Sequence, residues 1–305
     1  MPYGYKRFAT RRRAELRMGS QLATTRTGPI EYTVSGSSTG LPVLYFHGGP
    51  GGHEQTDLLA PLASLGCRLI GWSRPGYLRT PLEVGRTFPE QADAATALLD
   101  ELGVARVVAY GLSGGGPPAI EFARRHPTRT TALVLESAIS RHYAPRIPAL
   151  VKMIYLSRHG AWLTSVAAHR WPRTAISDFV RQESSLDSQT RRTTVDWILS
   201  DRSKMEYVRA VLGALTPYED RAPGLENDLE QWATLDDSLT AGVTCPTLVL
   251  HGSHDGDAEP SNAYHAAATI PQAELHIVSG GWHLLGLSLN GGTADEARRS
   301  FLGLA

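Results

Sequence analysis

The sequence predicts an α/β protein: a mostly parallel central sheet with helices on both faces, and a helical cap inserted between two of the strands. Two observations carry this prediction. Short runs rich in Val, Ile and Leu, typical of strands buried on both faces, alternate with segments whose apolar residues recur at helical spacing. Between about residues 140 and 235 the alternation stops and the pattern is helical throughout, after which a strand pattern returns.

The predicted strands are short apolar runs bounded by Gly, Pro or polar residues. They cover residues 42–47, 67–72, 106–110, 131–137, 246–251 and 274–279. Helical spacing of apolar side chains predicts helices over 89–103, 117–127 and 294–304. Strands that alternate with helices in this way form parallel sheets whose two faces are covered.

The break in the alternation divides the chain. Residues 1–139 and 236–305 are predicted to form the core, and residues 140–235 the cap or lid. Ligands bind outside the carboxyl ends of the strands in such sheets, so an insertion that leaves from a strand end would cover the site. The first 20 residues are basic and lack the apolar stretch of a secretory signal, so we expect a solvated extension or a short helix there.

Composition and charge narrow the class of partner. The 305 residues include 30 Lys or Arg and 30 Asp or Glu, so no net charge draws the chain to nucleic acid or to an anionic membrane. No apolar run approaches the roughly 20 residues of a membrane span. Cys67 and Cys245 are too few for a disulfide scaffold or a structural zinc site, and free thiols indicate a cytoplasmic protein. The expected partner is a small-molecule substrate, with no cofactor or metal; a homodimer is left open.

Ser113 is the candidate nucleophile. It lies in the segment GLSGG (111–115), directly after one predicted strand and before a predicted helix. This segment fits G-x-S-x-G in the strand–turn–helix context that the nucleophile motif requires. The turn is too tight for side chains two positions either side of the serine, which explains the glycines. The alternative, a flexible glycine-rich loop with an incidental hydroxyl, does not explain the flanking strand and helix.

A serine nucleophile needs a histidine base and a carboxylate that orients the histidine. In enzymes with this turn, the chain order is Ser, acid, His. Asp255 and Asp257 follow one later strand and His283 follows the next, so these groups lie at the same edge of the sheet as Ser113. Asp255 is favoured as the acid, and Asp257 is the alternative.

Other carboxylates and histidines are weaker candidates. Glu136, at the end of a predicted strand, is a third option for the acid. His251 closes a strand and His254 directly precedes Asp255, so neither easily faces both that carboxylate and the serine. His276 lies inside a predicted strand, where it is more often a core or surface residue.

A second glycine-rich segment, HGGPGG (47–52), follows another predicted strand. Its glycines let backbone N–H groups approach a substrate oxygen, and attack on a carbonyl needs two such donors for the oxyanion. We expect one donor from Gly114, the residue after the nucleophile, and the other from Gly49. A phosphate cradle is the rival interpretation, but the chain has no G-K-[ST], and neither glycine cluster fits G-x-G-x-x-G.

Together, HGGPGG, GWSRPGY, GLSGGGPPA, HGSHD and GGWHLL, in this order, resemble the α/β-hydrolase fold enzymes. The resemblance covers roughly residues 28–140 and 240–303. It implies Ser113, Asp255 and His283 as a catalytic triad and His47 as a structural residue of the oxyanion loop. It also implies that the helical insertion is the family's cap.

The sequence departs from the family pattern at two places. The family's common Asp before the R-x-G turn is Ser73 here, followed by Arg74, which puts the local support of this turn in doubt. The acid loop is one residue longer than usual between Asp255 and Pro260, which keeps Asp257 open as the acid.

These motifs predict a serine hydrolase that cleaves an ester-like small molecule (a carboxylic ester, thioester or lactone) through an acyl-enzyme. One alternative is an aminopeptidase of the proline iminopeptidase type, whose branch shares HGGPGG but differs at the nucleophile and turn segments. Such an enzyme would need carboxylates in the cap to bind the free α-amino group of its substrate. Three glutamates lie there, Glu183, Glu206 and Glu219, but their pattern is that of a solvated helix face. A cofactor-free lyase or carbon–carbon bond hydrolase with the same triad is the other alternative.

Aromatic residues of the insertion are open to two interpretations. They line an apolar pocket under the lid, or they pack between the cap and the core, which is the commoner role at helical spacing. The residues are Trp162, Trp171, Trp197 and Tyr207.

Overall fold

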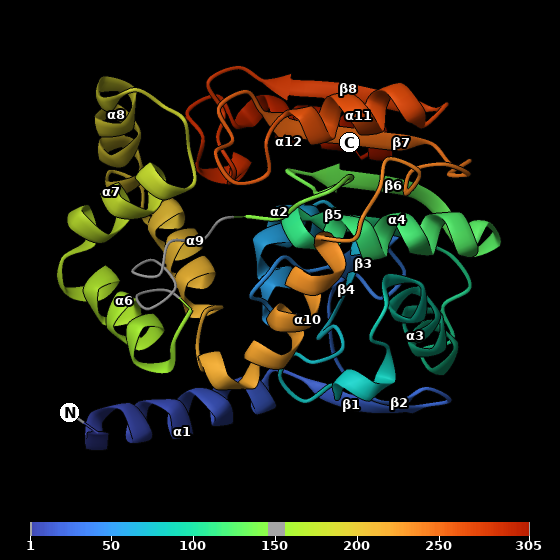
Figure 1. Cartoon of the computed structure of the whole chain (residues 1–305), viewed down its shortest axis with the longest axis horizontal. Helices are drawn as coiled ribbons and strands as arrows, with labels where there is room; N and C mark the ends of the chain where they lie inside the picture. The colour runs from blue at the N-terminus through green and yellow to red at the C-terminus, as the bar shows by residue number, and fades with distance from the viewer. Residues whose placement is uncertain (1, 146–155, 305) are drawn as a thin grey trace.

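A computed structural model describes residues 2–145 and 156–304. Within these residues one eight-stranded sheet runs in the order β1-β2-β4-β3-β5-β6-β7-β8 (Figure 1). β1, β2 and β4 pair antiparallel and the remaining neighbours pair parallel. The strands are β1 Gln21–Thr25, β2 Gly28–Gly36, β3 Pro42–Phe46, β4 Arg68–Trp72, β5 Val107–Leu112, β6 Thr130–Glu136, β7 Thr247–Gly252 and β8 Ala273–Val278.

Helices cover both faces of the sheet, because alternate strand residues are apolar on each side. Leu44 and Phe46 of β3 belong to the core cluster under α3, α4 and α11, whereas Val43 and Tyr45 belong to the cluster under α2 and α12. These helices are α2 Ala60–Ser64, α3 Phe88–Glu101, α4 Gly116–Arg125, α11 Ser261–Thr269 and α12 Gly292–Leu302. Short 3-10 helices lie at η1 His53–Leu59, η2 Leu82–Val84, η3 Ser113–Gly115, η4 Pro127–Arg129, η5 Tyr218–Asp220 and η6 Leu285–Leu287.

The predicted fold class is confirmed, and the six predicted strands correspond to β3 through β8. The hairpin of β1 and β2 was not predicted. Its two strands are partly exposed and carry polar residues in an uneven pattern, so no continuous apolar run marks them. They extend the parallel sheet by an antiparallel edge (Figure 1).

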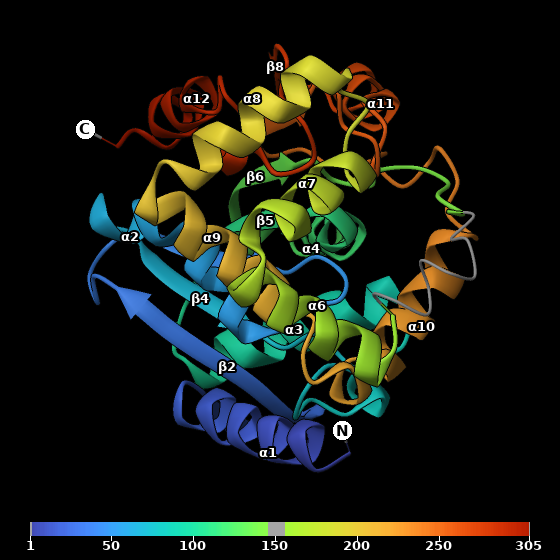
Figure 2. The same ribbon diagram turned by 90° about the vertical axis from the view of Figure 1, so that its left-hand side faces the viewer.

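The predicted cap region holds five helices of the described chain, of which α6 to α9 lie together beside the sheet (Figure 2). They are α6 Arg158–Arg170, α7 Pro172–Gln182, α8 Ser188–Leu199, α9 Arg202–Gly213 and α10 Ala222–Trp232. α6 to α9 bury an apolar cluster of their own, which also takes in Trp282 and Leu284 of the core. The cap therefore packs directly against the loop that carries His283. The domain limits at 140 and 235 stay a prediction.

The basic N-terminal segment forms a helix, α1 Pro2–Met18, which lies at the bottom of both views (Figures 1 and 2). Arg13 donates to both oxygens of Asp220 at 2.7 and 2.9 Å, and the Tyr5 hydroxyl donates to Glu219. The Tyr5 ring meets the edge of Trp162 at 5.9 Å. The helix thus joins the cap to β1.

None of the described helices is long and apolar enough to cross a membrane. Cys67 and Cys245 are both buried free thiols.

Candidate active site

Ser113 follows β5 directly and begins the turn into α4. Its φ of 51° lies in the left-handed region, which is strained for a residue with a side chain. The flanking glycines allow this turn: a Cβ on Gly115 would lie 2.0 Å from the Phe46 carbonyl oxygen, and one on Gly111 would lie 2.8 Å from the Gly115 oxygen. Strand and helix approach so closely that neither position has room for a side chain.

The structure brings the three predicted triad residues into one hydrogen-bonded row. The Ser113 hydroxyl is hydrogen-bonded to His283 Nε2 at 3.0 Å, and His283 Nδ1 donates to the two oxygens of Asp255 at 2.9 and 3.1 Å. Asp255 and His283 are only 3% and 6% exposed. The row therefore has the geometry that activates a serine hydroxyl.

Asp255 is held as a carboxylate from several sides. His251 Nε2 lies 3.2 Å from its Oδ2, and the Asp257 backbone N–H donates to its Oδ1 at 3.0 Å. Burial raises the pKa of Asp255, but His283 and His251 outweigh it and lower the pKa to about 2. His251 thus supports the acid, and its own Nε2 is directed at the Ala258 carbonyl at 2.6 Å, while His254 bonds Ser253.

Asp257, the alternative acid, lies at the opposite edge of the imidazole. Its Oδ2 is 3.7 Å from His283 Nε2, the nitrogen that faces Ser113, and its Oδ1 accepts from the Tyr143 hydroxyl. The Nδ1 edge is occupied by Asp255. Burial lowers the pKa of His283, but Asp255, Asp257 and Glu183 outweigh it and raise the pKa to about 10. Asp257 faces the substrate side of the base.

The segment 47–52 lies against the nucleophile. A Cβ on Gly48 would lie 3.2 Å from Ser113 Cβ, and the Gly48 N–H already donates to Gln55 Oε1 at 3.1 Å. The Gly49 N–H has no acceptor among the described residues, which leaves it available to a substrate oxygen. Gly114 faces Trp232, since a Cβ there would lie 2.2 Å from the indole Cζ2.

His47 ties this loop to the R-x-G turn. Burial and the neighbouring Arg74 lower the pKa of His47 well below its usual range, so its neutral Nε2 accepts the Arg74 backbone N–H at 3.0 Å. The Arg74 Nε donates to the His47 carbonyl at 3.0 Å. The guanidinium then reaches Asp228 of α10 at 3.0 and 2.5 Å, and neither charged side chain is exposed. Sequence reasoning did not identify Asp228.

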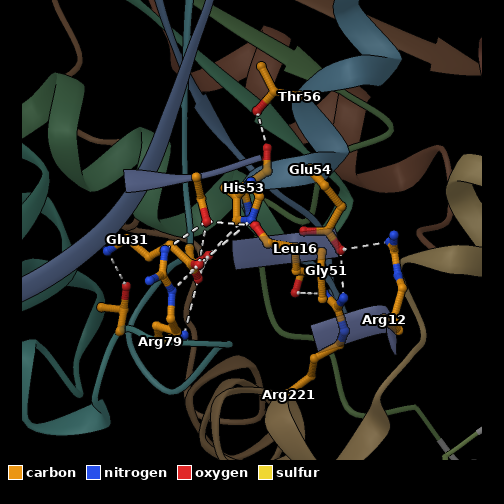
Figure 3. A network of polar contacts seen from close by, with 12 residues as sticks. Arg12, Leu16, Glu31, Gly51, His53, Glu54, Thr56, Arg79 and Arg221 are labelled. Atoms are coloured by element: carbon orange, nitrogen blue, oxygen red, sulfur yellow. Dashed lines mark hydrogen bonds and ion pairs between the residues drawn. The ribbon is translucent and has the colours of Figure 1, made fainter. Parts of the chain in front are cut away.

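Glu31 of β2 supplies the carboxylate that the turn lacks at position 73. The Ser73 hydroxyl donates to Glu31 Oε2 at 3.0 Å and accepts the His53 N–H at 3.2 Å. Arg79 donates to the same carboxylate at 2.6 Å from Nε and at 3.1 Å from its backbone N–H. Figure 3 shows Glu31 between Arg79 and His53. The doubt about the support of this turn is answered by a residue of the unpredicted hairpin.

Arg221, at the start of α10, fixes the other end of the loop. It donates to the Gly51 carbonyl at 2.5 Å and to Glu54 at 2.6 Å, with no exposure of its own (Figure 3). Arg12 of α1 lies 3.9 Å from the same Glu54 carboxylate. The buried Arg221 side chain therefore binds the cap to the glycine-rich loop 47–52.

A pocket of about 420 Å³ opens in front of Ser113. Its apolar wall includes Ile139, Phe179, Leu215, Leu225, Leu229 and Trp232. None of the aromatic residues named from the sequence lines it: Trp162 packs on α1, Trp171 is 60% exposed, Trp197 stacks under the Lys204 ammonium at 4.2 Å, and Tyr207 lines a different cavity. The packing interpretation holds for Trp162, and Trp232 lines the pocket instead.

Glu183, just after α7, also lines this pocket beside Asp257 and His283. The backbone places it there: the Gly256 N–H donates to the Glu183 carbonyl at 3.1 Å, and the Ser185 N–H donates to the His254 carbonyl at 3.0 Å. Burial and Asp257 raise the pKa of the Glu183 carboxyl to about 8. The longer acid loop thus pairs with the cap and brings a second carboxylate to the site. Glu206 and Glu219 are not among the pocket residues.

A larger cavity of about 850 Å³ lies behind Leu58 and Leu112, which line both spaces. The residues that line it include Tyr110, Glu136 and Arg298. The Arg298 guanidinium forms an ion pair with the Glu136 carboxylate at 2.9 Å and donates to the Tyr110 hydroxyl. Glu136 is therefore engaged away from His283, whose Nδ1 is bonded to Asp255. This cavity contains neither Ser113 nor His283.

Comparisons with known proteins agree with this architecture. The model of the α/β hydrolase fold family matches residues 42–288. The chain is similar to YcgS, an uncharacterized hydrolase of Bacillus subtilis, with 28% identity over 90% of this chain and 95% of the relative. It is also similar to the 2-hydroxy-6-oxononadienedioate/2-hydroxy-6-oxononatrienedioate hydrolase of Cupriavidus pinatubonensis, with 25% identity over 85% of this chain and 86% of the relative. A solved α/β hydrolase fold protein from Nakamurella multipartita matches with a TM-score of 0.85 and 32% identity, covering 93% of this chain and 98% of that one.

Proposed function

The chain belongs to the α/β hydrolase family, and we propose that it is a serine hydrolase that cleaves an ester-like small molecule through an acyl-enzyme on Ser113. The observation that carries the proposal is the hydrogen-bonded row of Ser113, His283 and Asp255 at the floor of the pocket. Two further statements stay predictions from the sequence: that the protein is cytoplasmic and that it needs no cofactor. Whether it forms a homodimer stays open.

In the acylation step, His283 Nε2 accepts the Ser113 proton as Oγ attacks the substrate carbonyl carbon. Asp255 stabilises the imidazolium that results and keeps Nδ1–H directed toward itself. The N–H groups of Gly49 and Gly114 donate to the oxyanion of the tetrahedral intermediate. The intermediate collapses when the imidazolium returns its proton to the leaving alcohol, thiol or lactone oxygen, and the acyl group stays on Ser113.

In the deacylation step, water takes the place of the leaving group. His283 Nε2 accepts a proton from the water as its oxygen attacks the acyl carbon, and the same two N–H groups stabilise the second oxyanion. Collapse of this intermediate breaks the bond to Oγ, which recovers its proton from the imidazolium. The products are a carboxylic acid and the free enzyme.

The charge of the pocket argues against the substrates named for the Cupriavidus relative, which are dicarboxylates. His283 is the single basic side chain among the described residues that line the pocket, and Glu183 and Asp257 are acidic. A dianion would meet these carboxylates without an Arg or Lys to pair with. This observation favours an ester-like substrate over a dicarboxylate one for the same nucleophile.

A serine-directed fluorophosphonate tests the assignment of Ser113. We expect the wild-type protein to be labelled, and Ser113→Ala to remain unlabelled. Labelling that survives Ser113→Ala contradicts the assignment. A panel of p-nitrophenyl esters of increasing acyl length, set beside Pro-β-naphthylamide, then separates an esterase from the iminopeptidase alternative.

A further inference from the structure

Three carboxylates surround one imidazole at the floor of the pocket. Asp255 accepts a hydrogen bond from Nδ1 of His283, and Asp257 lies 3.7 Å from Nε2. Glu183 lies next to Asp257 and His283. One oxygen of Glu183, one of Asp257 and a ring nitrogen of His283 all lie within 4.8 Å of one another. The Asp255 carboxylate is paired with His283 and His251, whereas Glu183 and Asp257 face the cavity.

The two cavity-facing carboxylates have no cation of their own. Among the described residues of the pocket, His283 is the one basic side chain, and it is already paired with Asp255. The two buried arginines nearby are engaged elsewhere, Arg74 with Asp228 and Arg221 with Glu54. Glu183 and Asp257 therefore outnumber the basic groups that the pocket offers them. The raised pKa of Glu183, about 8, keeps a proton on that carboxyl at neutral pH, and a cation that arrives with a ligand would favour its ionised form.

Contacts hold the Asp257 carboxylate and the backbone of Glu183 in place. The Tyr143 hydroxyl donates to Asp257, and the Asp257 N–H donates to Asp255. Glu183 is held through its backbone, whose carbonyl accepts from Gly256. A Cβ on Gly256 would lie 2.8 Å from the Ser184 carbonyl carbon, so this approach of the acid loop to the cap requires glycine. Asp257 is thus ordered before a ligand arrives, and the backbone of Glu183 keeps its carboxyl group within reach of the same cation.

Trp232 gives a second, independent sign of a polar ligand in the same pocket. Its side chain is 4% exposed, and its indole Nε1 has no acceptor among the described residues. The ring touches the two glycines expected to bind the oxyanion, with Cζ2 2.2 Å from a Cβ on Gly114 and Cη2 3.1 Å from one on Gly49. A buried N–H without an acceptor is destabilising, and a ligand that brings an acceptor atom to this indole would satisfy it.

We propose that Glu183 and Asp257 form a subsite for a cationic group of the substrate, an ammonium carried close to the scissile carbonyl. The proposal rests on the proposed function, since it places the ammonium relative to Ser113. The substrate class is then an amino-substituted ester whose apolar part fills the wall formed by Phe179, Leu215 and Leu229.

An ammonium at this subsite also acts on the base. Asp257, and Glu183 when it is ionised, stabilise the protonated form of His283, which cannot accept the Ser113 proton. A cation between the two carboxylates offsets their effect on the ring and favours the neutral imidazole. Binding of the cationic substrate therefore raises kcat as well as lowering KM.

Two isosteric esters test the proposal: L-leucine p-nitrophenyl ester and p-nitrophenyl 2,4-dimethylpentanoate, in which a methyl replaces the ammonium. At pH 6.5 in EDTA, after subtraction of spontaneous hydrolysis, we expect the leucine ester to have a kcat/KM roughly 10-fold higher or more, the size of one charge-assisted hydrogen bond. Part of the ratio should be in kcat. Glu183→Gln and Asp257→Asn should each bring the ratio towards one.

Glu226→Gln is the matched control, because Glu226 is an exposed glutamate of cap helix α10 outside the pocket. It should keep the wild-type ratio. A wild-type ratio of one or below, or a ratio that survives in both pocket variants, overturns the proposal. Equal turnover of the two esters leaves the serine hydrolase function in place, whereas absence of turnover together with absence of labelling at Ser113 contradicts that function.

A second measurement does not depend on turnover. Leucinamide should slow fluorophosphonate labelling of wild-type Ser113 more than 2,4-dimethylpentanamide does, and this difference should disappear in Glu183→Gln. Equal protection by the two amides overturns the proposal. So does calorimetric binding of Zn²⁺ that needs Glu183 and Asp257 while the two esters react equally, because that result assigns the carboxylates to a metal ion.

Discussion

Arg74 of the core and Asp228 of the cap helix α10 form a two-point ion pair from which water is excluded, at 3.0 and 2.5 Å. Tyr77 adds a third hydrogen bond to the same carboxylate at 2.7 Å. Because Arg74 also holds His47 of the oxyanion loop, this pair links the position of α10, and with it Trp232, to the loop beside the nucleophile.

Asp228→Asn should lower the free energy of unfolding by about 3 kcal/mol, since removing one partner of a buried ion pair leaves the other charge unpaired. Urea denaturation monitored by circular dichroism measures this loss. Glu226→Gln, on the exposed face of the same helix, should change it by less than about 0.5 kcal/mol. Equal stabilities of the two variants would contradict the role given to the pair.

Gly114→Ala should reduce kcat/KM by about 100-fold, the effect of losing one oxyanion donor. The added methyl would lie 2.2 Å from the Trp232 ring, so the backbone N–H must move away from the oxyanion position. Steady-state kinetics on a p-nitrophenyl ester measures the change. Gly292→Ala is the control, because a Cβ there meets nothing within 4 Å, and it should keep the wild-type rate.

The activity towards a neutral ester should depend on pH through His283. Asp255, Asp257 and Glu183 face its imidazole and raise its pKa to about 10, so kcat/KM should rise as the pH increases above 7 and the ring loses its proton. Asp257→Asn removes one of these negative charges and destabilises the imidazolium. The rise should then occur at lower pH; a profile that stays in place, or moves upward, argues against an electrostatic effect of Asp257 on the base.

Ser73→Asp should destabilise the protein even though Asp is the residue that the family pattern led us to expect there. The new carboxylate would face Glu31, whose Oε2 already accepts from the Ser73 hydroxyl at 3.0 Å, and two buried carboxylates would repel each other. We expect a loss of about 3 kcal/mol in urea denaturation. Adding Glu31→Gln should recover part of that loss. Additive losses in the double variant would contradict the view that Glu31 takes the place of the carboxylate expected at position 73.

The core of the fold and the candidate reacting groups could be predicted from the sequence because they follow local rules. The strands from β3 to β8 are continuous apolar runs, and the residues around Ser113 have a steric reason to be glycine. Asp255 and Asp257 could not be separated in this way, since they are two residues apart in one loop. Only the direction of the imidazole distinguishes them: Nδ1 meets Asp255, and Nε2 faces Asp257.

The residues that surround the nucleophile were less accessible, because tertiary contacts define them. Glu183 looks like any polar residue at the end of a helix until the acid loop pairs with its backbone. Trp232 and Asp228 lie on one helix with no motif to mark them, and Glu31 belongs to a hairpin whose polar pattern gives no strand signal. In each case the partner lies more than 40 residues away in sequence.

The contact between Trp232 and Gly114 gives the protein an optical reporter of its own. Indole emission responds to charges and to hydrogen bonding at Nε1, and this indole lies next to the residue that follows the nucleophile. Of the six tryptophans, Trp232 is the one that lines the pocket in the described part of the chain. Stopped-flow fluorescence would therefore follow the arrival of a colourless substrate and the build-up and decay of the proposed acyl-enzyme without any attached dye.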